Sequence, residues 1–73
     1  MELRPLDMLN KARNQRIIVE LKNGKQLIGK LTSFDIHINI VMEDCEERVN
    51  GELTRKIGNA FIRGDTIIMI SSD

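Results

Sequence analysis

Alternation of apolar and polar side chains with a period of two residues is the feature that most limits what this chain can fold into. From Ile17 onward, residues 17, 19 and 21 point to one face and residues 18, 20 and 22 to the other, as in a half-buried β-strand. Asn23-Gly24 follows at once, and Asn-Gly is the strongest short hairpin signal because both turn positions require positive φ. The sequence therefore predicts a β-protein that begins with a hairpin.

A glycine inside the next predicted strand indicates a sharply curved sheet. Leu27 and Leu31 continue the buried face on either side of Gly29. Glycine in a strand interior usually marks a sharp bend or a close approach of two backbones. In a chain this small, a bent strand predicts a curled sheet or a closed barrel.

Two more strands are predicted in the middle of the chain. The third runs through the alternating apolar positions of residues 38–42 and is expected to end in the acidic residues 43–47, a solvated strand end rather than a metal site. Asn50-Gly51 predicts another turn. A fourth strand follows through Leu53, Ile57 and Phe61, with Gly58 as a second candidate bend.

The last predicted strand, residues 66–70, is apolar on both faces and follows a tight turn at Arg63-Gly64-Asp65. Both faces of such a strand should be covered, and the edge of a terminal strand is an open template for pairing with another chain. We therefore expect it to pair with the exposed fourth strand of a neighbouring copy. Such a head-to-tail contact closes into a ring if the rotation fits.

One short helix is expected ahead of the strands. Pro5 suits a first helical turn, residues 6, 9 and 12 are apolar at helical spacing, and Asn14 suits the end of the helix. The predicted fold is therefore mostly β, with a short N-terminal helix followed by five strands.

The length of the chain predicts one small domain, residues 1–73, that needs extra stabilisation. A chain of this size buries only about 60% of its unfolded surface, so oligomerisation, a metal or a disulfide is expected. Cys45 is the only cysteine, which excludes an internal disulfide, and one cysteine with one histidine does not complete a tetrahedral zinc site. Oligomerisation remains, with no cofactor and no metal expected.

The charges balance, with 11 basic and 11 acidic residues. This balance argues against a protein that coats nucleic acid through bulk positive charge, but it allows a local site of a few focused groups. The N-terminus has no signal-peptide layout, and no apolar run approaches the roughly 20 residues of a membrane span. A soluble, cytoplasmic protein without a membrane partner is expected.

The candidate binding residues flank two predicted strands. Asp35, His37 and Asn39 lie beside one apolar run, and Arg63 and Asp65 lie beside another, as expected of loops displayed by strands. Single-stranded RNA is read by stacking bases on aromatic, histidine or guanidinium planes and by pairing with their edges. The chain has no Trp or Tyr, so His37 and Arg63 are the candidate planes. An Asn amide offers a donor and an acceptor, which match N3–H and a carbonyl oxygen of uracil.

Two of these groups also have purely structural interpretations. Arg63 and Asp65 also fit, as the weaker interpretation, a surface ion pair around a turn glycine, which contributes little stability. Asp35 is equally the pattern of a turn residue that bonds its own backbone, and this role is compatible with a binding role.

Two segments of the chain resemble the motifs of a known family. Residues 19–24, 29–31 and 34–42 resemble the first Sm motif, and residues 60–67 resemble the second. The chain is therefore similar to the Sm-like (Lsm) proteins of the archaeal type. This resemblance implies a short N-terminal helix on a strongly bent, five-stranded antiparallel barrel. It also implies a ring, usually of seven subunits, closed by pairing of the fourth strand with the neighbour's fifth.

The resemblance further implies that uridine-rich single-stranded RNA binds at the inner rim of the ring. His37 and Arg63 would sandwich a uracil, with Arg63 coming from the same or the neighbouring subunit, and Asn39 would hydrogen-bond the base edge. Asp35 and Asp65 would orient Asn39 and Arg63. Gly64 would let the base approach the backbone.

Three functions of different classes fit these observations to different degrees. The leading hypothesis is an RNA-binding ring that acts as a chaperone or scaffold in RNA processing or turnover. The alternative is a structural ring-forming module without an RNA role, for which a base-sized polar slot would be unnecessary. A small nuclease using Asp35, His37 and Asp65 lacks a convincing set of acid, base or metal ligands. The chain is therefore not expected to be an enzyme.

Overall fold

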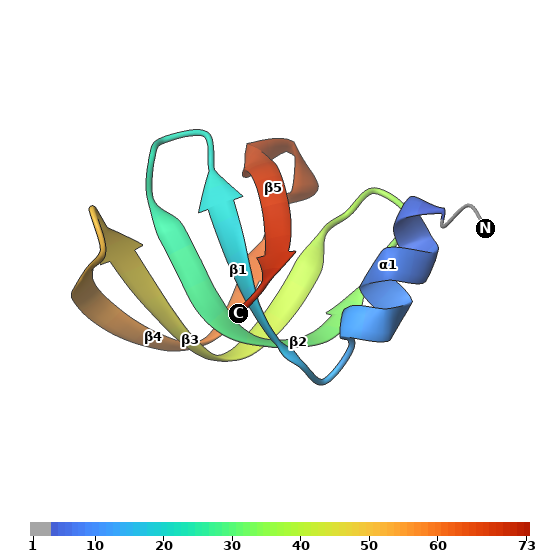
Figure 1. Cartoon of the computed structure of the whole chain (residues 1–73), viewed down its shortest axis with the longest axis horizontal. Helices are drawn as coiled ribbons and strands as arrows, with labels where there is room; N and C mark the ends of the chain where they lie inside the picture. Colours follow the sequence, from blue (N-terminus) through green and yellow to red (C-terminus); the bar gives the residue numbers. More distant parts are fainter. Residues whose placement is uncertain (1–3) are drawn as a thin grey trace.

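The computed structural model describes residues 4–73, which form one short helix and a single five-stranded sheet (Figure 1). The strands are all antiparallel to their neighbours, in the order β4-β3-β2-β1-β5. This architecture confirms the predicted fold class. Along the chain the elements are α1 (Pro5–Ala12), β1 (Arg16–Leu21), β2 (Gln26–Phe34), β3 (Ile40–Val49), β4 (Glu52–Ile62), the 3₁₀ turn η1 (Gly64–Thr66) and β5 (Ile67–Ser72).

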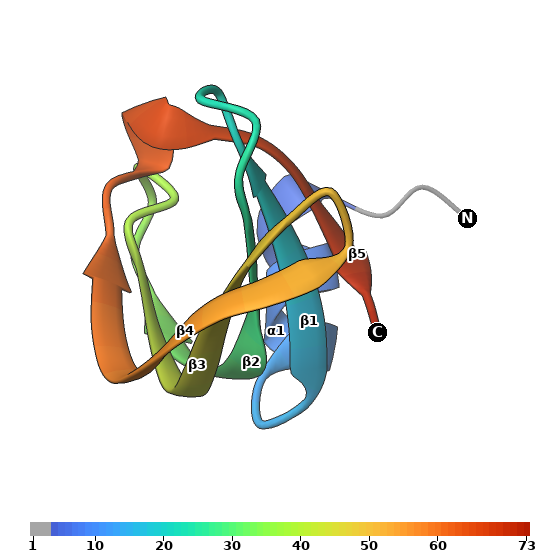
Figure 2. The same ribbon diagram turned by 90° about the vertical axis from the view of Figure 1, so that its left-hand side faces the viewer.

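The long strands β2, β3 and β4 curve strongly, so that the sheet folds back on itself (Figure 2). Gly29 permits this bend, because a Cβ there would lie 2.8 Å from the carbonyl oxygen of Glu43 and 3.0 Å from the Cα of Cys45. The prediction of a close backbone approach at Gly29 is therefore confirmed. Gly58, the second candidate bend, has φ +86° and faces Cys45 where the β3–β4 register shifts.

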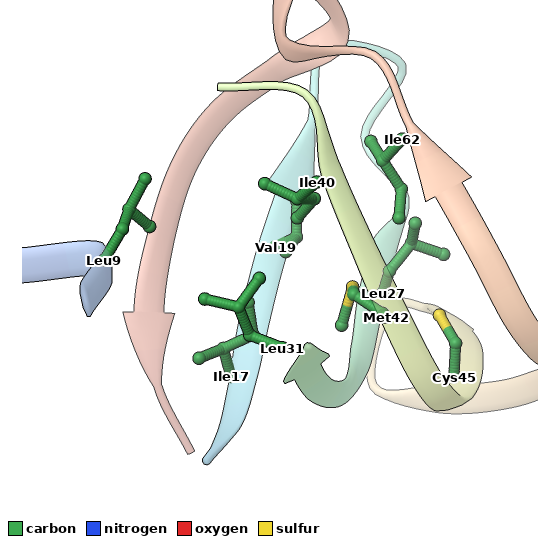
Figure 3. Close-up of a cluster of buried hydrophobic side chains, with 9 residues drawn as sticks. All are labelled: Leu9, Ile17, Val19, Leu27, Leu31, Ile40, Met42, Cys45 and Ile62. Carbon is green, nitrogen blue, oxygen red and sulfur yellow. The ribbon is translucent and has the colours of Figure 1, made fainter. Parts of the chain in front are cut away.

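The core lies inside the curved sheet and is closed at one end by the helix (Figure 3). Leu9 supplies the contact from α1, with Leu6 and Ala12 packed beside it, as the helical spacing predicts. Burial of an aliphatic side chain of this size contributes roughly 1.5–3 kcal/mol. The cluster of buried residues consists of Leu9, Ile17, Val19, Leu27, Leu31, Ile40, Met42, Cys45 and Ile62.

The two Asn-Gly turns have different geometries. Asn50 and Gly51 both have positive φ (53° and 81°) and form the two-residue turn expected of this pair. At Asn23-Gly24 only the glycine has positive φ, so the prediction for both positions was wrong there. The connection is longer, and the side-chain oxygen of Asn23 accepts a hydrogen bond from the backbone N–H of Lys25. Residues 22–24 form a three-residue loop closed by the hydrogen bond from Leu21 N–H to the carbonyl of Lys25, and in such a loop only the third residue, Gly24, takes positive φ.

Three predicted strand limits also need correction. The third strand begins at Ile40, because Ile38 has φ +63° and belongs to the preceding loop. The acidic residues do not end this strand, since β3 continues through them to Val49 and pairs with β4. The last strand begins at Ile67 and not at Thr66, because residues 64–66 form η1. In β4 it is Ile62 that is buried, whereas Phe61 is 67% exposed.

The edge strands of the sheet are β4 and β5, the strands that were predicted from the sequence to pair between copies. β4 and β5 each have one open edge. The expectation that β5 would be covered on both faces is not met within one chain, because Ile68 and Met69 are 65% and 49% exposed. No helix within residues 4–73 is long and apolar enough to cross a bilayer.

Candidate functional site

The candidate residues lie on two loops that are distant in sequence and joined in space. The 35–39 loop connects β2 to β3, and the 63–66 loop connects β4 to β5; Figure 2 shows both near the same end of the sheet. The Oδ1 of Asn39 accepts a hydrogen bond of 2.9 Å from the backbone N–H of Gly64. This bond links residues that are 25 positions apart.

The 35–39 loop is a tight hairpin organised by Asp35. The backbone N–H of Asp35 donates to the carbonyl of Asn39 (3.1 Å), and the carbonyl of Asp35 accepts from the N–H of Ile38 (3.1 Å). The carboxylate Oδ1 accepts from the N–H groups of His37 (2.9 Å) and Asn39 (3.1 Å), while Oδ2 accepts from Asn39 Nδ2 (3.0 Å). The turn-residue interpretation of Asp35 therefore holds, and the same carboxylate orients Asn39.

These hydrogen bonds favour the ionised form of Asp35. The bond from the Asn39 side chain is the main reason that the pKa of this carboxyl lies below its ordinary value. The backbone N–H groups of Asn39 and His37 lower the pKa further, whereas partial desolvation of the carboxylate raises it and offsets part of the shift. The carboxylate is consequently an acceptor only, which determines which end of the Asn39 amide faces it.

Asn39 is half-buried, and both ends of its amide are engaged by the protein. Nδ2 donates to Asp35, and Oδ1 accepts from Gly64. An amide has two N–H donors and two acceptor lone pairs. One N–H and one lone pair therefore remain for a ligand, in an order that the two protein contacts determine.

Gly64 is required where the two loops pack together. A Cβ at this position would lie 2.8 Å from the carbonyl carbon and 2.9 Å from the carbonyl oxygen of Ile38, and closer still to the carbonyl oxygen of His37. The resemblance assigned this glycine to the approach of a base. The structure supplies a different reason for a glycine, namely contact between the backbones of the two loops.

The two planar candidates, His37 and Arg63, are exposed and lie on the two joined loops. Arg63 Nη2 lies 3.3 Å from Asp65 Oδ2, with side chains 72% and 63% exposed. An ion pair this exposed contributes little stability. The pair places the guanidinium beside the turn, and the orienting role that the resemblance implied for Asp65 stays a prediction.

Sequence reasoning missed the role of Ile38 in the loop. It is half-buried, packs against the core cluster and adopts the left-handed backbone region at φ +63°. With His37, Gly64 and Asp65 it also lines a groove of about 1230 Å³ that runs between α1 and β5. The sequence carried no signal for this conformation, because residues 38–42 were predicted as strand and a β-branched residue disfavours positive φ.

The site contains two exposed planar groups, an imidazole and a guanidinium, together with one amide held at both ends and two carboxylates. This is a set that can stack on and hydrogen-bond a flat polar ring. Within the described residues 4–73, no group of three or more His, Cys, Asp or Glu side chains could hold a metal ion.

Comparison with known proteins gives consistent results for both sequence and structure. The model of the LSM domain family matches residues 7–72. A protein of Archaeoglobus fulgidus named as an snRNP Sm-like protein is 48% identical over 68 residues, which are 93% of this chain and 88% of that protein.

Two solved structures have the same fold. The Sm protein of Pyrococcus abyssi, solved in complex with a uridine heptamer, superposes with a TM-score of 0.92 at 38% identity, covering 94% of this chain and 97% of that one. A heptameric archaeal Sm protein superposes with a TM-score of 0.84 at 32% identity, covering 90% of this chain and 96% of that one.

Proposed function

The chain belongs to the LSM domain family, and from this premise we propose that it binds uridine-rich single-stranded RNA through its 35–39 and 63–66 loops. The observation that carries the proposal is the fixed amide of Asn39, held by Asp35 on one side and by Gly64 on the other. The similarity to a protein solved with a uridine heptamer supports the same ligand.

The fixed amide favours uracil over cytosine. Uracil presents N3–H and a carbonyl oxygen side by side, which match the free lone pair and the free N–H of Asn39. Cytosine presents an amino group and an unprotonated N3 in the opposite order. To match a cytosine held in the same position, with N3 opposite Oδ1, Asn39 would have to turn its NH₂ toward the Gly64 N–H and its oxygen toward the Asp35 carboxylate. An amide turned in this way would lose its hydrogen bonds to Asp35 and Gly64, each worth about 0.5–1.5 kcal/mol net, which is sufficient for useful selectivity.

Stacking supplies the sequence-independent part of the binding. His37 and Arg63 are exposed planes on adjoining loops and would sandwich the base, with Arg63 from the same or the neighbouring subunit and oriented by Asp65. Base stacking of this kind contributes roughly 1–3 kcal/mol per base. One site would therefore bind weakly on its own.

A ring of subunits, a heptamer by analogy with the similar structures, would multiply this weak site. The open edges of β4 and β5 support a head-to-tail contact between copies. Exposed apolar side chains lie along both of these strands: Leu53 and Phe61 on β4, Ile68 and Met69 on β5. Pairing between copies would cover them, and one RNA strand that visits several sites gains affinity from effective concentration.

In this proposal residues 1–73 form a single Sm-like domain that acts without catalysis, as an RNA chaperone or scaffold in RNA processing or turnover in the cytoplasm. The alternative is a ring-forming assembly module without an RNA role. The Asp35–Asn39–Gly64 arrangement favours RNA binding, because assembly alone requires no amide held ready at an exposed loop.

Native mass spectrometry with equal amounts of a uridine run and a cytidine run tests the proposal. We expect a closed ring that carries the uridine run alone. A ring that ignores both RNAs would support the assembly module, and a monomer would refute the edge pairing. Asn39→Ala should lose the selectivity, whereas the matched control Gln15→Ala, which removes an exposed amide outside both loops, should retain it.

A further inference from the structure

The residue between His37 and Asn39 has an unusual backbone conformation. The 35–39 loop is closed by the Asp35–Asn39 backbone hydrogen bond, with Ile38 N–H donating to the carbonyl of Asp35. This is the pattern of a three-residue hairpin loop, whose third residue takes the left-handed region and is usually glycine. Here that residue is Ile38, at φ +63°.

A β-branched residue is among the least suited to this conformation. Positive φ is uncommon for any residue other than glycine, and Asn and Asp tolerate it best. A branched side chain at such a position persists only where its surroundings enforce it, and such positions cluster at functional sites.

Three sets of contacts enforce the conformation of Ile38. On either side of it, the N–H groups of His37 and Asn39 both donate to the carboxylate Oδ1 of Asp35. Its own carbonyl group packs against Gly64, where a Cβ would collide with it. Its side chain is half-buried and packs against the core cluster. The backbone is therefore bonded from one side, and the side chain anchors it from the other.

We propose that Ile38 is a positioning residue whose anchored side chain keeps the 35–39 loop in one conformation, with His37 and Asn39 ready to bind a base. This inference rests on the proposed RNA-binding function. Glycine would satisfy the backbone geometry without strain, but it would have no side chain to anchor in the core and a larger choice of backbone conformations. The unfavourable residue therefore gives a preorganised loop, which reduces the ordering required on binding.

Two substitutions separate the anchor from the backbone conformation. Ile38→Gly removes the anchor and relieves the strain, whereas Ile38→Leu keeps an anchor of similar volume. Binding of a three-nucleotide uridine oligomer is measured by calorimetry, so that the affinity of single sites is not masked by avidity. Hydrogen exchange of the His37 and Asn39 amides is measured in the free protein.

For Ile38→Gly we expect an affinity about two- to fivefold weaker, the factor set by the additional backbone freedom of glycine, and faster exchange of both amides. Ile38→Leu should stay within about twofold of the parent in both measurements, because the anchor is kept. A glycine variant that unfolds more readily but binds the oligomer and exchanges these amides like the parent would refute the inference, since Ile38 would then be only a packing residue.

Failure of the proposed function gives a distinguishable result. A parent protein without affinity for the uridine oligomer would refute RNA binding at this site. The exchange rates would still decide the structural part, because unchanged rates in Ile38→Gly would show that Ile38 does not restrain the loop.

Discussion

Replacement of Gly64 by alanine tests directly whether the packing of the two loops holds the site together. The φ angle of Gly64 is not in the left-handed region, so alanine meets no backbone strain there. Its Cβ would instead lie 2.8 Å from the carbonyl carbon of Ile38, and every close neighbour is a backbone atom of the 35–39 loop. The loops must therefore separate to admit it.

The expected cost follows from these contacts. Overpacking of this kind typically costs about 1–3 kcal/mol. Separation of the loops also breaks the bond from Gly64 N–H to Asn39 Oδ1, worth about 0.5–1.5 kcal/mol net. A loss of about 2–4 kcal/mol in the free energy of unfolding corresponds to a fall in Tm of roughly 8–30 °C for a chain of this size.

The assay is thermal unfolding followed by circular dichroism at matched protein concentration, since the stability of an oligomer depends on concentration. Gly51→Ala is the matched control, because its Cβ meets no atom within 4 Å and the only penalty is that of positive φ. We expect Gly64→Ala to be the more destabilised variant and to lose its preference for uridine. A Gly64→Ala protein whose Tm stays within about 2 °C of the Tm of the parent, far less than the shift expected above, would refute the packing argument.

Three further predictions concern recognition, pH and assembly. In filter-binding assays, Asn39→Ala should abolish the preference for uridine over cytidine runs, whereas Arg63→Ala should weaken both by about 1–3 kcal/mol through lost stacking; a retained preference in the first variant would contradict the assigned role. The pKa of Asp35 is lower in the folded protein than its ordinary value of 3.8. The contribution of this carboxylate to the free energy of unfolding should therefore be complete above pH 3.8 and lost as the pH falls through the folded pKa. Unfolding measured at a series of acid pH values should show this loss in the parent and not in Asp35→Asn. Phe61→Asp places a charge on the exposed face of β4 and should convert the proposed ring to monomers in analytical ultracentrifugation. The control Lys56→Gln changes an exposed position of the same strand without placing a like charge opposite Glu46, and it should be tolerated better.

Local patterns in the sequence determined the strands, the helix and the bends. Alternation with a period of two is a property of neighbouring residues, so β1 and β2 were predictable without knowledge of their partners. The same holds for Gly29, because a glycine inside a strand has few other uses. The two open edges followed from the apolar character of residues 66–70 and the limits of a small sheet.

The strand limits depended on partners that local patterns do not specify. The acidic stretch continues as strand because β4 pairs with it along its length, with Glu46 opposite Lys56 and Glu47 opposite Arg55. Asn23 avoids positive φ because the connection is a three-residue loop, in which only the third residue, Gly24, takes the left-handed conformation. Such outcomes depend on pairing and loop length, to which residue preferences are only a weak guide.

The residue types of the candidate site were readable in the sequence, but only the tertiary structure decided how they act together. Asp35, His37 and Asn39 are neighbours along the chain, so their association with one loop was predictable. The bond between Asn39 and Gly64 spans 25 residues, and it exists because β3 and β4 pair with Ile40 opposite Ile62, which places the two loops side by side. That contact fixes the amide, gives Gly64 its steric role and helps hold Ile38 in a conformation that its own preferences oppose.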